Sequence, residues 1–316
     1  FGRRSKAYNF IFPRAFIAMK LGNYKKIIVV PYYEDSVAVA RFINELVRLY
    51  AQEVFLVVVD DGSIKSPIEC SIFNQAKLDG AIVRLCRNVG HQKALAIGLS
   101  YLSGQIHDGQ IIVVMDSDGE DLPETIEQLA SELSRTDIDI AVAQRFRRVE
   151  TIKFKIAYQF YKIIFRLLTG KKISFGNFMA MKINAFKRII AMRELPLHIA
   201  ATVLISRLRL KHVPVRRGPR YEGQSKMNFL SLVLHAFRAL MVFAEDVFIR
   251  VGIMCAIIAT LSVLFAFVAI ILKLIGFATP GWFSVALGVL IVIFLQTGAL
   301  ALMTLILTGV ARSDNA

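Results

Sequence analysis

Two stretches, in each of which a hydrophobic run leads directly into acidic residues, decide the fold: Val57-Val58-Val59-Asp60-Asp61-Gly62-Ser63 and Val113-Val114-Met115-Asp116-Ser117-Asp118-Gly119-Glu120. Short runs rich in β-branched residues predict buried strands. In an open parallel sheet, ligands bind beyond the carboxyl ends of the strands. The two stretches therefore predict an α/β sheet with acidic side chains at its ligand-binding edge.

The flanking sequence extends this pattern over residues 27–143. Five apolar runs are strand candidates: Ile27–Val30, Val54–Val59, Ala81–Leu85, Ile111–Met115 and Ile138–Val142. Three segments between them have helical length and spacing: Val37–Leu49, His91–Leu102 and Pro123–Leu133. Such alternation predicts βαβ units and a mainly parallel, Rossmann-like sheet.

The C-terminal part is too apolar for an ordinary soluble domain. Hydrophobic residues make up 55% of the chain, and residues 251–272 and 274–311 contain no Asp, Glu, Lys or Arg. A helix of roughly 20 apolar residues crosses the hydrocarbon core of a bilayer. We predict two transmembrane helices, at residues 247–272 and 283–310.

The positive charge lies outside these spans. The chain has 39 Lys and Arg against 24 Asp and Glu, a net charge of +15, and only Arg250, Lys273 and Arg312 are basic beyond residue 246. The positive-inside rule then places the N-terminal part and, with two spans, both termini in the cytoplasm. An anionic bilayer surface explains the charge more simply than nucleic acid, so we expect no nucleic-acid binding.

Three other segments complete the organisation. Residues 1–26 form a basic N-terminal segment without acids. Residues 152–168, within a catalytic domain spanning 27–226, interleave Lys and Arg with aromatic and aliphatic residues, and residues 227–246 are rich in Leu, Phe and Val. Both predict amphipathic helices at the membrane interface. Two core helices packed on the sheet are the alternative.

The acidic residues after the fourth strand candidate, Ile111–Met115, suit a metal ion. Asp116 and Asp118 lie two residues apart on an extended segment, and Glu120 continues the alternation. Carboxylate oxygens are the ligands that Mg²⁺ and Mn²⁺ prefer, and these ions bridge to substrate phosphates. The alternative is that acids after strands cap helices or form turns.

Glycine-rich phosphate loops and hydrolase motifs are absent from the sequence, which disfavours kinases, dehydrogenases and hydrolases.

Five motifs follow one another in the chain: Val29–Asp35 (similar to V-V-P-x-Y-N-E), Asp60–Ser63 (D-D-G-S), Arg87–Leu95 (R-N-x-G-x-x-x-A-L), Asp116–Pro123 (similar to D-A-D-L-Q-D-P-P) and Arg220–Lys226 (R-x-x-G-x-S-K). In these motifs the chain resembles the membrane family 2 glycosyltransferases that act on dolichyl or undecaprenyl phosphate. The resemblance covers about residues 27–250. It implies a GT-A fold and inverting sugar transfer from a UDP- or GDP-linked donor to a polyprenyl phosphate, with Mg²⁺ or Mn²⁺.

The resemblance also implies roles for single residues. Those expected to bind the nucleotide sugar are Pro31, Tyr33, Asp35, Asp60, Asp61, Lys93, Asp116, Ser225 and Lys226. The expected metal ligands are Asp116, Asp118 and Glu120, and the expected catalytic residues are Asp116, Asp118, Arg145, Asn177 and Arg220. Many relatives have aspartate at the position of Asn177. The amide side chain of Asn177 cannot accept a proton at neutral pH. A lipid phosphate is already ionised near pH 7, whereas a hydroxyl acceptor would need another base, for which His198 is a candidate.

Other functions are weighed by specific features. A processive polysaccharide synthase would carry Q-x-x-R-W, but the only tryptophan is Trp282. Transfer to a glycolipid or diacylglycerol hydroxyl stays open, as does a non-catalytic protein that binds nucleotide sugars. Homo-oligomerisation also stays open, because Thr260, Ser262 and Gly288 are small enough for close helix packing.

Overall fold

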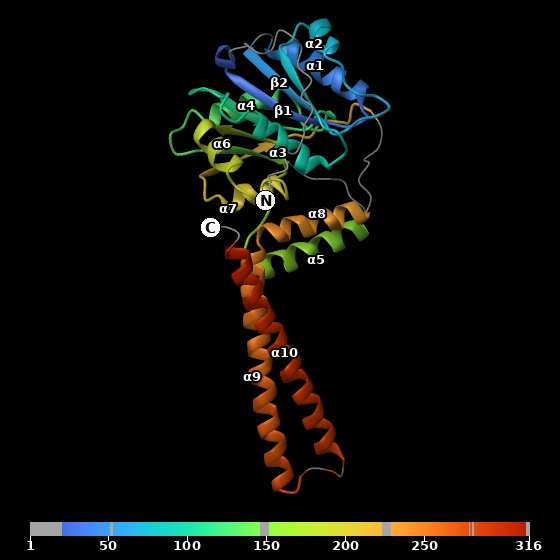
Figure 1. Cartoon of the computed structure of the whole chain (residues 1–316), viewed down its shortest axis with the longest axis vertical. Coiled ribbons are helices and arrows are strands. Elements are labelled where there is room, and N and C mark those ends of the chain that lie inside the picture. Colours follow the sequence, from blue (N-terminus) through green and yellow to red (C-terminus); the bar gives the residue numbers. More distant parts are fainter. Residues whose placement is uncertain are drawn as a thin grey trace, which may run out of the picture. The chain divides into compact units, whose positions relative to one another are not determined.

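The computed structural model describes residues 21–50, 53–145, 152–222, 229–277, 279 and 281–313. The chain divides into two compact units. One contains all seven strands with α1 to α4 and α6 to α8, and the other contains α5, α9 and α10 (Figure 1). Most of the predicted basic segment 1–26 lies outside the described residues.

The first unit is built on a seven-stranded sheet with the order β3-β2-β1-β4-β6-β5-β7. Its strands are β1 (Lys26–Tyr32), β2 (Val54–Asp60), β3 (Gly80–Arg84), β4 (Ile111–Val114), β5 (Ile140–Arg145), β6 (Met179–Lys182) and β7 (Leu210–Val215). The first four strands form a parallel set, and β5 pairs with β7 in parallel, whereas β6 is antiparallel to both β4 and β5. The predicted mainly parallel sheet is confirmed.

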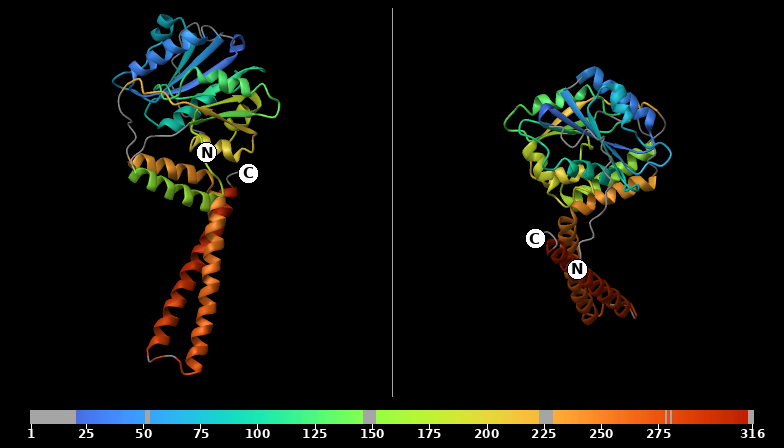
Figure 2. Two further views of the ribbon diagram at one scale, coloured as in Figure 1. Left: turned by 180° about the vertical axis from the view of Figure 1, so that it is seen from behind. Right: turned by 45° about the horizontal axis from the view of Figure 1, so that its top comes forward.

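Helices cover both faces of the sheet because successive strand side chains point to opposite sides. Ile27 and Val29 pack with α3 (His91–Tyr101), α6 (Ile183–Ile190) and α7 (Ile199–Ile205). Ile28 and Val30 pack on the other face with α1 (Ser36–Tyr50), α2 (Ser71–Ala76) and α4 (Thr125–Glu132). The two helical layers can be followed in Figure 2. Strands buried on both faces explain the continuous apolar runs in the sequence.

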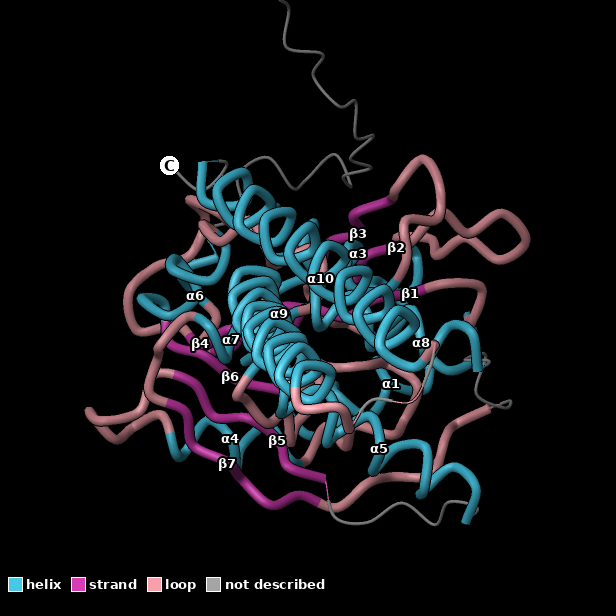
Figure 3. Tube along the Cα trace, turned by 90° about the horizontal axis from the view of Figure 1, so that it is seen from below, coloured by secondary structure: helices cyan, strands magenta, loops and turns pink. Residues whose placement is uncertain are grey.

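The second half of the sheet departs from the simple alternation. Strand β6 lies between β4 and β5, and β7 forms the edge (Figure 3). Because β6 runs antiparallel, the α6 helix that follows it starts at the amino end of β4, where Lys182 pairs with Ile111. The carboxyl ends of β1, β2 and β4 thereby remain at one edge, together with the loops that follow them.

The second unit consists of α5 (Ile152–Thr169), α9 (Ala244–Leu274) and α10 (Trp282–Ser313). Helices α9 and α10 form an antiparallel pair (Figure 1), and both are long and apolar enough to cross a membrane. The buried residues of α9 are small, namely Cys255, Ala259, Ser262 and Ala269. Small side chains permit close helix packing. Helix α5, expected within the 27–226 domain, packs on this unit, where Phe165 meets Phe243 edge to face at 5.7 Å.

Candidate functional site

The two acidic stretches meet at the carboxyl end of β1. Tyr32 pairs with Asp60 across β1 and β2, and the Asp61 amide donates to the Tyr32 carbonyl at 2.9 Å. From β4, the Ser117 hydroxyl donates to the Pro31 carbonyl at 3.1 Å. These contacts place the two stretches on either side of β1, where ligands bind in open α/β sheets.

The turn after β2 is held by two carboxylates. Asp60 is completely buried, where it accepts a hydrogen bond from the Ser63 amide at 3.0 Å and lies 3.3 Å from Arg84 Nε. Glu34 stands where similar enzymes have asparagine, and it accepts hydrogen bonds from the amides of residues 64–66 at 2.6–2.9 Å. These amides lower the pKa of Glu34. Glu34 therefore orders the loop beside the site, a role that sequence reasoning missed.

Asp61 fixes the entry to α3. Its two carboxylate oxygens accept hydrogen bonds from the Val89 and Gly90 amides at 2.7 and 2.9 Å. Burial raises the pKa of Asp61 in spite of these bonds. In this arrangement both oxygens are engaged by the protein itself, so Asp61 contributes to the site through the loop that it holds.

Replacing Asp61 with asparagine is expected to destabilise the protein by about 1–3 kcal/mol, because an amide group would then face one of the two backbone donors. Thermal unfolding in detergent measures the loss. Asp108→Asn is the matched control, since Asp108 is exposed and its carboxylate takes part in no hydrogen bond or ion pair with another described residue. Equal stability of Asp61→Asn and wild type would contradict the role of this carboxylate.

The carboxylates of the turn after β4 form ion pairs with two arginines. Arg220 Nη2 lies 2.6 Å from Asp118 Oδ2, and Arg220 Nε lies 3.2 Å from Glu120 Oε1. Arg217 forms an ion pair with the other oxygen of Glu120. Burial opposes ionisation of Glu120, but the two arginines hold its pKa below the ordinary value. Two guanidinium groups thus lie beside the carboxylates that were predicted from the sequence.

Backbone contacts bring these arginines to the turn. The Gly218 amide donates to the Glu120 carbonyl at 3.1 Å, and the Tyr221 amide donates to the Asp118 carbonyl at 2.9 Å. Tyr221 also donates from its hydroxyl to Glu45 on α1. The segment 217–221 is therefore fixed on both the acidic turn and α1. Arg217 and Tyr221 are site residues that the sequence motifs did not reveal.

The residues fit a divalent cation only in part. Within the described parts of the chain, no three Asp, Glu, His or Cys side chains gather into a group that could hold a metal ion. Both oxygens of Glu120 are paired with arginines, so the expected trio of Asp116, Asp118 and Glu120 does not converge. Both oxygens of Asp118 also have protein partners, the Glu120 amide at 3.0 Å and Arg220 at 2.6 Å. Asp116 and Asp118 nevertheless place carboxylates, the ligand type that Mg²⁺ and Mn²⁺ prefer, at the ligand-binding edge of the sheet.

A hydrogen-bond chain leads from α7 to Asp116. The Ile199 amide donates to buried Gln92 Oε1 at 2.8 Å, so Gln92 Nε2 donates to Asn177 Oδ1 at 3.1 Å. The Asn177 amide nitrogen then donates to His91 Nε2 at 2.8 Å. The same His91 nitrogen lies 3.4 Å from Asp116 Oδ1. Desolvation lowers the pKa of His91, and the carboxylates of Asp118, Asp61 and Asp121 oppose this shift. The hydrogen-bond chain therefore ends on an imidazole nitrogen beside the acidic turn.

The remaining expected residues lie in different settings. Pro31 lies in β1 and Tyr33 directly follows this strand. Asp35 precedes α1, and Lys93 is exposed in the first turn of α3. Arg145 ends β5, but its side chain lies outside the described part. Ser225 and Lys226 also lie outside the described residues.

His198, the other candidate base, lies at the start of α7. Its Nδ1 accepts a hydrogen bond from the Ala201 amide at 3.2 Å, and its ring stacks on His235 at 4.4 Å. Burial lowers its pKa to about 3. These contacts give His198 a helix-capping role.

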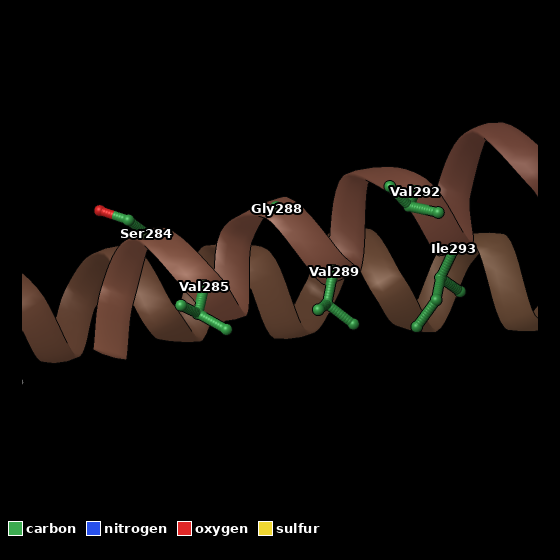
Figure 4. Close-up of a pocket in the computed structure, with 6 residues that line it drawn as sticks. All are labelled: Ser284, Val285, Gly288, Val289, Val292 and Ile293. Carbon is green, nitrogen blue, oxygen red and sulfur yellow. The ribbon is translucent and has the colours of Figure 1, made fainter. Parts of the chain in front are cut away.

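A hollow on α10 lies apart from this chemistry. Figure 4 shows its lining, made up of Ser284, Val285, Gly288, Val289, Val292 and Ile293. None of these side chains is charged or titrates near neutral pH. The candidate site is therefore the acidic edge of the sheet rather than this hollow.

Comparisons with known proteins agree with this geometry. The profile of Glycosyl transferase family 2 matches residues 27–193. An uncharacterized glycosyltransferase of Synechocystis sp. is 31% identical over 281 residues, covering 83% of each chain. The undecaprenyl-phosphate 4-deoxy-4-formamido-L-arabinose transferase of Salmonella paratyphi B is 26% identical over 218 residues, covering 65% of this chain and 63% of that protein.

Solved structures show the fold. Glucosyl-3-phosphoglycerate synthase from Mycobacterium tuberculosis, in complex with Mn²⁺, UDP and glucosyl-3-phosphoglycerate, has a TM-score of 0.51 at 13% identity, covering 72% of this chain and 81% of that one. The same enzyme with Mn²⁺ and UDP-glucose gives a TM-score of 0.50 at 13% identity, with coverage of 72% and 80%. The seven-stranded unit is therefore GT-A-like, and the expected resemblance is confirmed: the chain belongs to glycosyl transferase family 2.

Proposed function

We propose that this protein is a membrane-bound, inverting glycosyltransferase that moves a sugar from a UDP- or GDP-linked donor to a polyprenyl phosphate. The observation that carries the proposal is the pairing of Arg217 and Arg220 with the acidic turn at the ligand-binding edge of the sheet. Guanidinium groups are suited to diphosphate binding. The name of the Salmonella relative supplies the class of acceptor.

In this proposal the ends of β1 and β2 bind the nucleoside, through Pro31, Tyr33, Asp35 and Asp60. Asp116 and Asp118 would hold Mg²⁺ or Mn²⁺, which neutralises charge on the leaving diphosphate. Arg220, with Arg145, Ser225 and Lys226, would bind the phosphate groups. Glu120 orients the two arginines, and Asp61 and Lys93 act at the start of α3.

The reaction is a single displacement. A phosphate oxygen of the lipid attacks the anomeric carbon on the face opposite the diphosphate, so the new bond forms as the bond to the diphosphate breaks. The nucleoside diphosphate leaves with the electron pair, and the configuration inverts. A phosphomonoester, with a second pKa of about 6, is largely ionised near pH 7 and needs no base.

A hydroxyl acceptor fits the site less well. Deprotonation of a hydroxyl needs a general base within hydrogen-bond reach. Asn177 has no basic group, and His91 Nε2 already accepts the hydrogen bond from Asn177. These contacts favour an acceptor that arrives as an anion.

The two long apolar helices support integration into a membrane. With the basic residues concentrated before residue 246, we propose that the catalytic unit and both termini face the cytoplasm. The segments 152–168 and 227–246 would then lie at the interface.

The deciding experiment measures release of nucleoside diphosphate by the detergent-solubilised protein, with UDP- and GDP-sugars, Mg²⁺ or Mn²⁺, and undecaprenyl phosphate. Release that requires both lipid phosphate and metal is expected. Release with diacylglycerol but not with lipid phosphate would replace the proposal with a hydroxyl-directed transferase. Donor binding without release under every condition would indicate a non-catalytic binding protein.

A further inference from the structure

Helix α8 (Phe229–Val242) carries an exposed apolar stripe. Its residues Ala239 and Val242 are buried, whereas Leu234, Phe237 and Met241 are 49%, 59% and 58% exposed. Spacings of three and four residues put these three side chains on one face of the helix. Large apolar side chains gathered on one exposed face mark a surface that binds an apolar partner.

A cation lies on the same face. Arg238 is exposed, four residues after Leu234 and three before Met241. Its guanidinium reaches the start of α3, since a methyl group placed on Gly90 would lie 3.8 Å from Arg238 Nη1. His91, the next residue, lies 3.4 Å from Asp116. The apolar stripe therefore continues to the edge of the candidate site through Arg238.

The charges around Arg238 favour an anion. On its own helix, His235 stacks on His198 of α7, and burial lowers the pKa of His235. Among the described residues, no carboxylate forms an ion pair with Arg238. Two acids lie near the start of α3, and both have other partners: Asp61 accepts hydrogen bonds from the Val89 and Gly90 amides, and Asp116 lies 3.4 Å from His91. An exposed guanidinium group beside an apolar stripe matches an amphiphile with an anionic head.

We infer that Leu234, Phe237, Met241 and Arg238 of α8 bind the acceptor lipid, with the prenyl chain on the apolar stripe and the phosphate at Arg238. The inference rests on the proposed function and names the acceptor subsite. The phosphate would then lie at the start of α3, on the His91 side of Asp116. Helix α8 would then determine acceptor specificity, because one of its faces contacts both the prenyl chain and the phosphate.

The first test is Arg238→Gln, which is expected to raise the KM for undecaprenyl phosphate about 10- to 100-fold, as for loss of a charge-assisted hydrogen bond. The KM for the nucleotide sugar stays unchanged, and Arg238→Lys recovers part of the affinity. Arg188→Gln is the matched control, because Arg188 is exposed on α6. An unchanged KM for undecaprenyl phosphate in Arg238→Gln would overturn the inference.

The second test separates the chain from the head. Phe237→Ser is expected to raise the KM for undecaprenyl phosphate several-fold, as for one exposed aromatic contact, but to leave the KM for geranyl phosphate nearly unchanged. Equal losses with both acceptors would overturn the role of the stripe. A change in oligomeric state in detergent would instead assign the stripe to a second copy of the chain.

A direct measurement of lipid binding tests the acceptor subsite separately from the proposed function. If wild-type protein transfers no sugar to any lipid phosphate, the proposed function fails. Binding of radiolabelled undecaprenyl phosphate to wild type and Arg238→Gln then decides the inference, which requires weaker binding by the variant. Equal competition by phosphatidylglycerol would show a general preference for anionic lipids and overturn a dedicated acceptor site.

Discussion

Replacing Asp118 with alanine is expected to reduce sugar transfer by about 1,000-fold while the protein stays folded and membrane-integrated. The change removes one of the two carboxylates proposed to hold the cation, and it leaves Arg220 without its 2.6 Å partner. Loss of one preorganised electrostatic group at a reacting centre has effects of about this size. Nucleoside diphosphate release at saturating donor and lipid phosphate measures the loss.

The control for this variant is Asp137→Ala, which removes another aspartate–arginine pair. Asp137 lies 3.1 Å from Arg135, and both side chains are exposed. This control is expected to transfer sugar at the wild-type rate. Near-wild-type activity of Asp118→Ala would remove the metal assignment. A large fall in its melting temperature would instead show that Asp118 acts by holding Arg220 and the 217–221 segment.

The first half of the sheet could be predicted from the sequence because its strands are buried on both faces. Runs such as Val54–Val59 are continuous in β-branched residues, and the helices between them have complete amphipathic periods. Strand β6 has the sequence Met-Ala-Met-Lys, which carries no β-branched residue. Its place between β4 and β5 depends on pairing with those strands. Tertiary contacts decide such short segments.

The parts of the candidate site that could be predicted are those whose position follows from the spacing of residues next to a strand. Asp116 and Asp118 alternate after a strand, so their position at the sheet edge follows from the strand itself. Arg217 could not be predicted in this way, because it reaches Glu120 from 97 residues later through backbone hydrogen bonds of its neighbours. The use of both Asp61 oxygens by amides also depends on the folded loop. Long-range partners of a carboxylate leave no periodic signal in a sequence.

Replacing Gly218 with alanine is expected to reduce transfer about 100-fold and to lower the melting temperature. A Cβ atom on Gly218 would lie 2.2 Å from the Gly119 carbonyl oxygen and 2.6 Å from Leu122 Cδ2. One backbone segment must move, which weakens the bond from the Gly218 amide to Glu120 and displaces the neighbouring arginines. Misplacement of a catalytic group by about 1 Å can cost a factor of this size. Steady-state kinetics and thermal unfolding measure the two effects.

The matched control is Gly22→Ala, since a Cβ atom there would meet His107 at an ordinary 3.5 Å. A double variant provides the sharper test of the mechanism. If Gly218→Ala acts by moving Arg220, its effect and that of Arg220→Ala must not add, because the second change removes what the first displaces. The double variant should then be about as active as Arg220→Ala alone. Full additivity of the two losses would mean that the 217–221 segment affects sugar transfer independently of Arg220. The proposed role of Arg220 in binding the diphosphate would then be wrong.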